Sequence, residues 1–276
     1  MEMVARAGAF VEAQGREIER ARFAYHFGEG SLERVIEALA AYQNPDGGFG
    51  NALEPDIKAP DSNPFATELA LLICIQAGMR GDEPLLQRTV AHLEATQHED
   101  GDWRFAPGVY EHELAPWFAA WEWPSLNPGC TTVGLLRELG LGSAELHARA
   151  ERLFERLAKV EDCVSGGFYG VRPYAFYFNQ RRDHPQRDVY ISGVLWWLIR
   201  QHLEGGDIDG GHFFEYARTP ETWIGHNLPP AIVQERLDGL LAEQQEDGGW
   251  PTPYDPAWRG WTTMQNLLIL RAWGRC

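Results

Sequence analysis

A short glycine turn that recurs along the chain constrains its fold more than any other feature. "QNPDGGFG" begins at Gln43, "QHEDGDWRF" at Gln97 and "QQEDGGWPTPY" at Gln244, and "VSGGFYGVRPY", which begins at Val164, is a weaker copy. Glycine supplies the left-handed backbone angles that tight turns need. Self-similarity at such spacing is typical of repeated supersecondary units, so the chain is expected to be built from repeats.

Each copy of the turn stands between two helical segments of different character. The segments before the turns carry apolar residues at i, i+3, i+4 and i+7, which predicts half-exposed helices over 31–43, 83–97, 143–160 and 230–244, with Ser31 and Ser143 as N-caps. The segments after the turns are apolar nearly all round. We therefore expect helices over 65–78, 131–140, 188–203 and 261–274 that are buried on more than one side.

This alternation predicts two concentric rings of helices, with the turns leading the chain from an outer helix to an inner one. A helix at about 3–25 and short pieces near 113–121 and 213–218 complete the expected set, and strand signals are nearly absent. We expect one all-α domain over residues 1–276, an α/α toroid with turns near 43–50, 97–105, 164–170 and 244–251. The alternative is a two-layer α-solenoid that does not close.

Composition and charge narrow the classes of function. The net charge of −16 argues against a nucleic-acid partner. The sequence lacks an apolar run that could span a bilayer and a secretion signal, which predicts a cytoplasmic protein. Its cysteines are far apart, so reduced, mostly buried thiols are expected, and its histidines and cysteines do not fall at the spacing of metal ligands. The sequence predicts no oligomeric state.

The repeated turn resembles the QW-type repeat of the squalene-cyclase and protein-prenyltransferase superfamily. The best match is "QEDGGW" over 245–250, followed by "GWTTMQNLLILRAW", and weaker similarity extends from about residue 31 to the C-terminus. The resemblance implies a toroid whose central, aromatic-lined cavity binds a hydrophobic, isoprenoid substrate. Other α/α toroids, among them polysaccharide lyases and thioester domains, use similar turns, so the motif indicates the fold more than the chemistry.

The chain departs from the catalytic motifs of that superfamily. Class II terpenoid cyclases protonate their substrate with an Asp-x-Asp-Asp motif, whereas "GDIDGG" supplies only Asp207 and Asp209. Protein prenyltransferases hold zinc with an Asp-x-Cys pair, whereas Asp188 is followed by Tyr190 where the cysteine would be. The resemblance thus implies the cavity without the hallmark catalytic residues. No cofactor is expected, and Mg²⁺ only if the substrate is a diphosphate.

Carboxylates in the insertions between turns and inner helices are the candidate catalytic groups, because these loops crowd around one end of a toroid's cavity. The first insertion, "NALEPDIKAPDSNP", contains Glu54 and Asp56, and the last, "PTPYDPAWRGW", contains Asp255. Burial would raise the pKa of one carboxyl and suit it to acid or base work. Asp56 is the leading candidate. The alternative is structural: Asp61 caps a helix, and Glu54 or Asp56 accepts backbone N–H bonds.

Aromatic and basic residues in the same insertions are the candidate binding groups. Aromatic faces could stabilise a cation in the cavity or could simply pack in the core. The densest basic stretch precedes Asp188 and suits a diphosphate or carboxylate, unless its arginines pair locally with Asp183 and Asp188. The predicted substrate-binding residues are Trp117, Trp121, Tyr174, Tyr177, Arg181, Arg182, Arg187, Tyr254 and Trp258.

The leading functional hypothesis is therefore a prenyltransferase-like or terpene-cyclase-like enzyme with carboxylate acid–base chemistry. Two alternatives stay open. A carbohydrate-active toroid, either a polysaccharide lyase or a glycoside hydrolase, would use Trp and Tyr platforms with paired carboxylates. A non-catalytic binding protein would keep the repeat fold without the chemistry.

Overall fold

The structure is a computed structural model that describes residues 2–206, 208 and 210–276. Over these residues the chain is helical, and its only β-type pairings are two isolated bridges, Gln43–Phe49 and Ile57–Leu114. The all-α prediction is confirmed. None of the described helices is both long and apolar enough to cross a membrane. Cys74, Cys130 and Cys163 are buried free thiols, and Cys276 is exposed.

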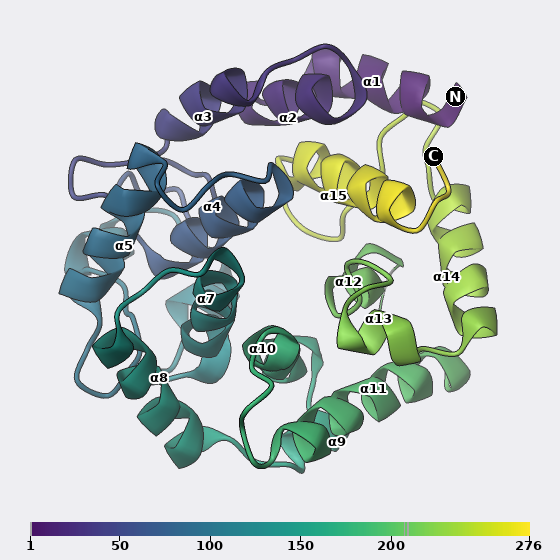
Figure 1. Ribbon diagram of the computed structural model, residues 1–276. Coiled ribbons are helices and arrows are strands. Elements are labelled where there is room, and N and C mark those ends of the chain that lie inside the picture. Colours follow the sequence, from purple (N-terminus) through teal and green to yellow (C-terminus); the bar gives the residue numbers. More distant parts are fainter. Residues whose placement is uncertain (1, 207, 209) are drawn as a thin grey trace.

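Figure 1 shows the helices in two rings, one inside the other. The outer helices are α1 (Glu2–Gln14), α2 (Glu17–Phe27), α3 (Leu32–Ala40), α5 (Pro84–Thr96), α8 (Ala144–Leu157), α9 (Asp162–Ser165), α11 (Arg187–Leu203) and α14 (Pro230–Ala242). The inner helices are α4 (Pro64–Gln76), α7 (Leu126–Leu139), α10 (Phe168–Asn179), α12 (Gly210–Glu215), α13 (Trp223–Asn227) and α15 (Trp258–Ala272). Two short helices, η1 (Pro107–Glu111) and α6 (Pro116–Ala119), lie in the connection between α5 and α7.

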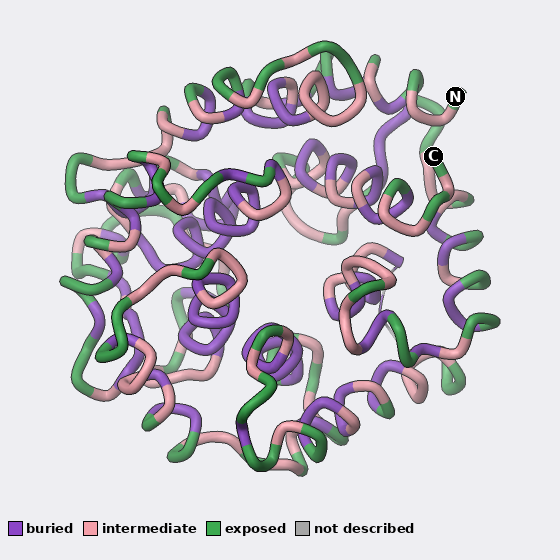
Figure 2. The backbone as a smooth tube through the Cα atoms, viewed as in Figure 1, coloured by how far each residue is buried: buried purple, intermediate pink, exposed green. Residues whose placement is uncertain are grey.

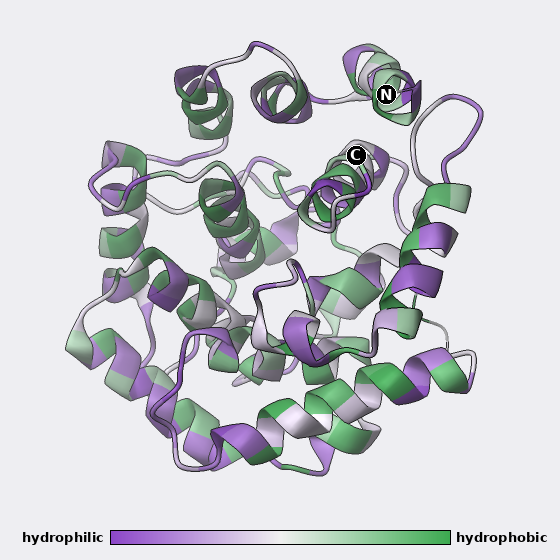
Figure 3. Cartoon of the chain, turned by 45° about the vertical axis from the view of Figure 1, so that its right-hand side comes forward, coloured by the Kyte–Doolittle hydropathy of each residue, from purple (hydrophilic) through white to green (hydrophobic). Residues whose placement is uncertain are grey.

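Inner helices are buried on more sides than outer helices. Helix α4 is buried without a break from Pro64 to Cys74, as expected for an inner helix that is apolar all round. Helix α8 buries only one stripe, which includes Leu146, Ala150 and Leu153, because charged residues fill its other face. Figure 2 shows this contrast between inner and outer helices, and in Figure 3 the helices on the outside alternate hydrophobic and hydrophilic stretches. Ser31 and Ser143 are N-caps, as predicted.

Three of the glycine turns share one conformation and one way of docking. The central glycines have positive φ: Gly47 (92°), Gly101 (93°) and Gly248 (91°). In each turn the glutamine four residues earlier donates from its side-chain amide to the glycine carbonyl oxygen, at 2.9–3.1 Å. The same amide donates to a carbonyl oxygen on the next outer helix, Leu85 of α5 for Gln43 and Leu146 of α8 for Gln97. The turns thus connect neighbouring repeats.

The last turn makes this contact with the first helix of the chain. Gln244 Nε2 donates to the carbonyl oxygen of Met3 at 3.0 Å, and Arg6 Nη2 donates to that of Gln245 at 2.6 Å. A Cβ on Gly248 would meet the carbonyl oxygen of Arg6, as a Cβ on Gly101 would meet that of Arg149. Helix α1 therefore occupies, relative to the last turn, the place that a following outer helix occupies relative to the others.

The segment 164–170 does not form the predicted fourth copy of the turn. Gly166 (φ −70°) and Gly167 (φ −75°) have ordinary negative φ, and the segment joins the end of α9 directly to the start of α10. The two glycines in "VSGGFYG" resemble the other copies. However, this copy lacks the preceding glutamine and aspartate whose side chains build the turn elsewhere.

The segment 188–203 is helical, as predicted, but it lies in the outer ring rather than the inner one (Figure 1). Its side chains Val189, Trp196 and Leu203 are 53%, 67% and 72% exposed, so an apolar sequence here does not mean burial on all sides. The inner helix of this repeat is α10, which covers a stretch that was expected to be a loop. Its first turns contain Gly170 and Pro173, which weaken the helical signal.

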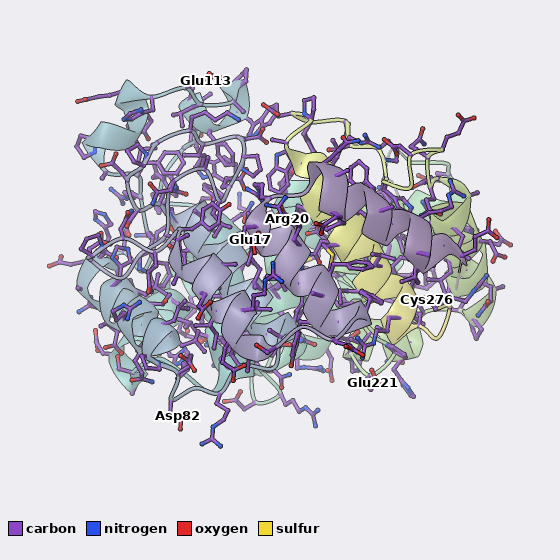
Figure 4. The ribbon with its side chains drawn as sticks, turned by 90° about the horizontal axis from the view of Figure 1, so that it is seen from above. Glu17, Arg20, Asp82, Glu113, Glu221 and Cys276 are labelled. Atoms are coloured by element: carbon purple, nitrogen blue, oxygen red, sulfur yellow. The ribbon has the colours of Figure 1, made fainter. Side chains whose placement is uncertain are left out.

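The long insertions gather at one end of the molecule. Figure 4 places Glu113, in the insertion before α7, at one end, and Asp82 and Glu221 at the opposite end. Asp82 lies in the link from α4 to the next outer helix, and Glu221 lies just before α13. The N-termini of α4, α7 and α15 therefore point to the insertion end, where their partial positive charge favours nearby anions.

Asp102 occupies the place in its turn that Gly48 and Gly249 occupy in the other two turns. Its side chain is completely buried; Oδ1 accepts the N–H of Trp103 at 2.8 Å, and Oδ2 accepts that of Ser125 at 2.7 Å. Burial raises the pKa of Asp102 to about 7, although both backbone N–H groups lower it. This carboxyl joins the turn to the residue that caps α7.

Replacing Asp102 with glycine should lower the free energy of unfolding by about 2–4 kcal/mol, because two buried N–H groups lose their acceptor.

The raised pKa of Asp102 also predicts that the free energy of unfolding depends on pH. Between about pH 4 and 7 the folded protein keeps a proton that the unfolded chain has lost, so stability falls as pH rises through this window. Urea unfolding across this range should show a shallower fall for Asp102→Asn. A parallel pH profile would contradict the assignment.

Candidate functional site

The inner helices enclose a cavity of about 1120 Å³. Its lining includes Trp117 and Tyr254 from the insertion end and Glu221 from the opposite end, so the cavity extends along the axis of the ring (Figure 4). Helices α4, α10, α12, α13 and α15 all contribute side chains to its wall. Apolar and aromatic groups are prominent in that wall, and charged side chains from several helices and loops lie among them.

Two of the predicted carboxyl groups, Glu54 and Asp56, line the insertion end of the cavity. Asp56 Oδ2 accepts a hydrogen bond from Trp258 Nε1 at 2.9 Å, and Glu54 Oε1 accepts one from the backbone N–H of Asp56 at 3.2 Å. Burial raises the pKa of Glu54 well above its ordinary value, and burial also raises that of Asp56, with the Trp258 hydrogen bond opposing it. Both carboxyl groups therefore hold their protons to higher pH than exposed ones do.

The backbone that carries this pair is strained. Asn51 (φ 55°) and Ala52 (φ 56°) are in the left-handed region, and they are the only described non-glycine residues with positive φ. Arg16 Nη1 holds the segment by donating to the carbonyl oxygens of Ala52 and Leu53 at 2.9 and 3.1 Å. Such outliers persist where the surroundings enforce them, and they cluster at functional sites.

The structural alternative for this loop holds in part. Glu54 does accept a backbone N–H, but the cap of α4 is Asn63, whose Oδ1 accepts the N–H of Ala66 at 2.9 Å. Asp61, the expected cap, does not fill that role, because α4 begins at Pro64 and places Asn63 at the N-cap position. A local turn therefore accounts for Glu54 but not for the placement of Asp56 on the cavity wall.

Aromatic side chains surround the acid pair. Trp117, Trp121, Tyr254 and Trp258, four of the residues expected to bind the substrate, all line the cavity. The ring centroids of Trp117 and Tyr254 are 5.9 Å apart, and those of Tyr254 and Trp258 are 6.5 Å apart. Trp121 also packs edge-on against Phe65 at 4.8 Å in a small apolar cluster under the second insertion. Trp121 therefore both lines the cavity and packs against the core.

Asp255, the third predicted catalytic carboxylate, is outside the cavity lining. It forms an ion pair with Lys58 at 3.3 Å and accepts the backbone N–H of Ala257 at 2.8 Å. That N–H, followed by Lys58, lowers the pKa of Asp255, so the group stays ionised. The structure thus corrects the expectation: Asp255 links the last insertion to the first one.

Tyr174 and Tyr177 are a second correction, because both point away from the cavity. Helix α10 presents a face with spacing of three and four residues to the cavity: Tyr169, Arg172, Phe176 and Asn179. On the opposite face, Tyr177 donates its hydroxyl to Glu151 on α8 at 2.7 Å, and the Tyr174 hydroxyl accepts the N–H of Lys159 at 3.0 Å. These two tyrosines pack the inner helix against the outer ring.

The predicted basic residues also differ in whether they line the cavity. Arg182 and Arg187 line the cavity, but Arg181 pairs with Glu151 and Asp183 outside the lining. Arg182 follows the C-terminal end of α10, so the arginines lie toward the end opposite Asp56 and not at the same mouth. Arg187 Nη1 is 3.1 Å from Asp188, whereas its Nε is buried with no hydrogen-bond partner in the described part of the chain.

Sequence reasoning missed a second group of charged residues in the wall of the cavity. Glu68 on α4, Arg172 on α10 and Glu215 on α12 form a buried ion network. A signal was present, because Glu68 is the single charged residue within the apolar segment 65–78. Asp207 and Asp209 lie outside the described residues. Within the described ranges, no group of three His, Cys, Asp or Glu side chains could hold a metal ion.

Comparison with known proteins gives one limited similarity. No family model matches the chain, and no solved structure is similar to it at a significant level. Over 77 residues, 28% of the chain, it is 36% identical to drimenyl diphosphate synthase of Streptomyces showdoensis. The matched stretch covers 14% of that relative's length. This similarity supports a distant relationship to a terpene cyclase and nothing more specific.

Proposed function

We propose that the chain is a single-domain α/α toroid of the terpenoid-cyclase and prenyltransferase-like type, and that it catalyses a proton-initiated reaction of an isoprenoid substrate. The observation that carries the proposal is the cavity itself. It holds two carboxyl groups of raised pKa among aromatic rings at one end and arginines toward the other. The contact of the last turn with Met3 and Arg6 supports a closed ring over an open solenoid.

In this proposal Asp56 is the proton donor and Glu54 assists it. A general acid must carry its proton at the working pH, and burial, which raises the pKa of Asp56, favours the protonated form. Asp56 is placed to donate, because it lines the cavity while Trp258 Nε1 holds its Oδ2 in position. Glu54, which is buried beside it, adds a second carboxyl of raised pKa whose proton could replace the one that is spent.

The aromatic wall would stabilise the positive charge that protonation of an alkene creates. Each aromatic face near a cation contributes about 0.5–2 kcal/mol when water is excluded. Trp117, Trp121 and Trp258 line the end where Asp56 would deliver the proton. At the other end, Arg182 and Arg187 suit a diphosphate. The relative's name describes the synthesis of a diphosphate ester, which agrees with an anionic end group on the substrate.

Two other functions remain as competing proposals. A glycan would need an open groove with exposed aromatic platforms, and only Trp117, 45% exposed, has that character among the cavity-lining tryptophans. A non-catalytic binding protein would need no acid. It would not explain why the loop that precedes Glu54 has strained backbone angles and is held by Arg16. These observations favour the isoprenoid enzyme.

The direct test is turnover with geranyl, farnesyl and geranylgeranyl diphosphate, followed by gas chromatography of the dephosphorylated products. We expect a cyclised or isomerised product from at least one chain length. Parallel assays with neutral and uronate-containing oligosaccharides address the carbohydrate alternative. Cleavage of a glycan with no change in any prenyl diphosphate would overturn the proposal in favour of a lyase or hydrolase.

The arginines that line the cavity can be tested by substitution, with a neighbouring arginine as the control. Replacing Arg187 or Arg182 with Gln should raise KM for a diphosphate substrate by about 10- to 100-fold, because one charge-assisted hydrogen bond contributes about 1.5–3 kcal/mol. The neighbouring Arg181→Gln is the control, since Arg181 pairs with Glu151 and Asp183 away from the cavity. Steady-state kinetics would contradict the anion site if Arg181→Gln raised KM as much as the other two variants.

A further inference from the structure

A buried ion network lies on the wall of the cavity and comes from three inner helices. Arg172 Nη1 is 2.7 Å from Glu68 Oε1, and Arg172 Nε is 2.7 Å from Glu215 Oε2. All three residues line the cavity. The side chains of Glu68 and Arg172 are only 5% and 8% exposed, whereas that of Glu215 is 31% exposed. The network is therefore shielded from bulk water at its Glu68 end.

The charges of this network do not balance. Two carboxylates share one guanidinium, which leaves one negative charge when both are ionised. His212 Nε2 is 3.8 Å from Glu215 Oε1 and compensates at that end of the network when it is protonated. At the other end, Glu68 Oε2 is buried and has no hydrogen-bond partner among the described residues. An unsatisfied buried carboxylate oxygen is costly, so a donor from a ligand would stabilise it.

The surroundings of the network favour a cation over a neutral donor. The guanidinium carbons of Arg172 and Arg218 already lie 4.6 and 5.1 Å from the centroid of Phe176, another cavity residue, so a further cation would be held by the carboxylates and not by this ring. Phe65 and Leu69 on α4 flank Glu68 in the cavity lining and supply apolar contact for an attached hydrocarbon. In such a low-dielectric setting, a net negative charge attracts a cation strongly.

We propose that Glu68, Arg172 and Glu215 form a binding site inside the cavity for a cationic group carried by a hydrophobic ligand, with Glu68 Oε2 accepting a hydrogen bond from a protonated amine. The inference rests on the proposed function in placing the hydrocarbon part of the ligand in the same cavity. For an isoprenoid substrate, it locates the stabilised positive charge next to Glu68.

Binding at this site should be coupled to proton release. Burial raises the pKa of Glu68, with Arg172 opposing that rise, so this carboxyl holds its proton to higher pH than an exposed glutamate does. A bound cation favours the ionised carboxylate and expels that proton. Calorimetric titrations in two buffers of different ionisation enthalpy would detect the release, which a purely structural role for Glu68 would not produce.

The test compares two probes of the same chain length on the full chain. N,N-dimethyldecylamine, protonated at neutral pH, should bind at least about tenfold more tightly than 1-decanol, a difference of about 1.4 kcal/mol. Glu68→Gln should abolish this preference and leave decanol binding unchanged, which shows an intact cavity. Glu138→Gln is the control, because Glu138 lines the same cavity but pairs one-to-one with Arg218 at 2.5 Å.

Equal affinity of the wild-type protein for the two probes would overturn the proposal, as would an unchanged preference in Glu68→Gln. If that variant does not fold, Glu215→Gln removes the same charge from a half-exposed position and should reduce the preference severalfold; no reduction would count against the site. Asp56→Asn should keep the preference for the amine. Its loss of turnover with intact amine binding would separate the acid from the cation site.

Discussion

Asp56→Asn is expected to lower turnover by about 10²- to 10⁴-fold, the usual contribution of a general acid. The amide cannot supply a proton, but it can still accept the hydrogen bond from Trp258 Nε1. The temperature of unfolding should therefore stay close to that of the wild-type protein. Product formation and a thermal melt of the same sample would measure both effects.

The matched control is Asp255→Asn, which removes a carboxylate from the neighbouring insertion. Asp255 pairs with Lys58 outside the cavity lining, and both side chains are more than a third exposed, at 38% and 35%. Such a pair contributes about 0–1 kcal/mol to stability. Turnover should change less than severalfold. Equal loss in both variants, or a loss in Asp56→Asn that matches its loss of stability, would indicate a structural role for the loop.

Gly101→Ala is expected to be among the most destabilising single substitutions in the chain. Its φ of 93° is unfavourable for alanine, and its Cβ would be inside van der Waals contact with the carbonyl oxygen of Arg149 on α8. Strain of the backbone together with displacement of a docked helix should lower the free energy of unfolding by about 3 kcal/mol or more. Chemical denaturation monitored by tryptophan fluorescence would measure it.

Gly78→Ala separates the two contributions. Gly78 also has positive φ, 65°, but a Cβ there would meet nothing within 4 Å. The left-handed conformation alone costs a non-glycine residue about 1–2 kcal/mol. The difference between the two variants measures the close docking of the turn against the next outer helix. If the two variants were equally stable, the turns would not connect the repeats in the way described.

The repeated turn and the helices beside it could be predicted because each signal is local. Gln97, Gly101 and the helix before them lie within one short window, and the turn geometry depends on those residues. The exchange of inner and outer helices around α10 and α11 could not be predicted in the same way. Hydrophobicity shows that Trp196 belongs to an apolar helix, but it does not show which side of that helix meets another one.

The candidate site was predictable only in part, because it depends on contacts between distant segments. Glu54 and Asp56 stood out as carboxylates in the first of the insertions between a turn and an inner helix. The partner of Asp56, Trp258, is 202 residues away, so only the tertiary contact between the first and last insertions brings the two together. Glu68 and Arg172 come from different repeats, so their network has no local signature. Tyr174 and Tyr177 share a helix with Arg172, yet the phase of that helix turns them away from the cavity.

Solvent deuterium incorporation tests the central claim most directly. The wild-type protein is incubated with a prenyl diphosphate in deuterium oxide, and the product is analysed by mass spectrometry. Proton-initiated chemistry from Asp56 predicts a product that carries one deuterium from the exchangeable carboxyl group, and product formation by Asp56→Asn that is lower by about 10²- to 10⁴-fold. A product without deuterium, or one that Asp56→Asn forms at the wild-type rate, would contradict the assignment of this carboxyl as the proton donor.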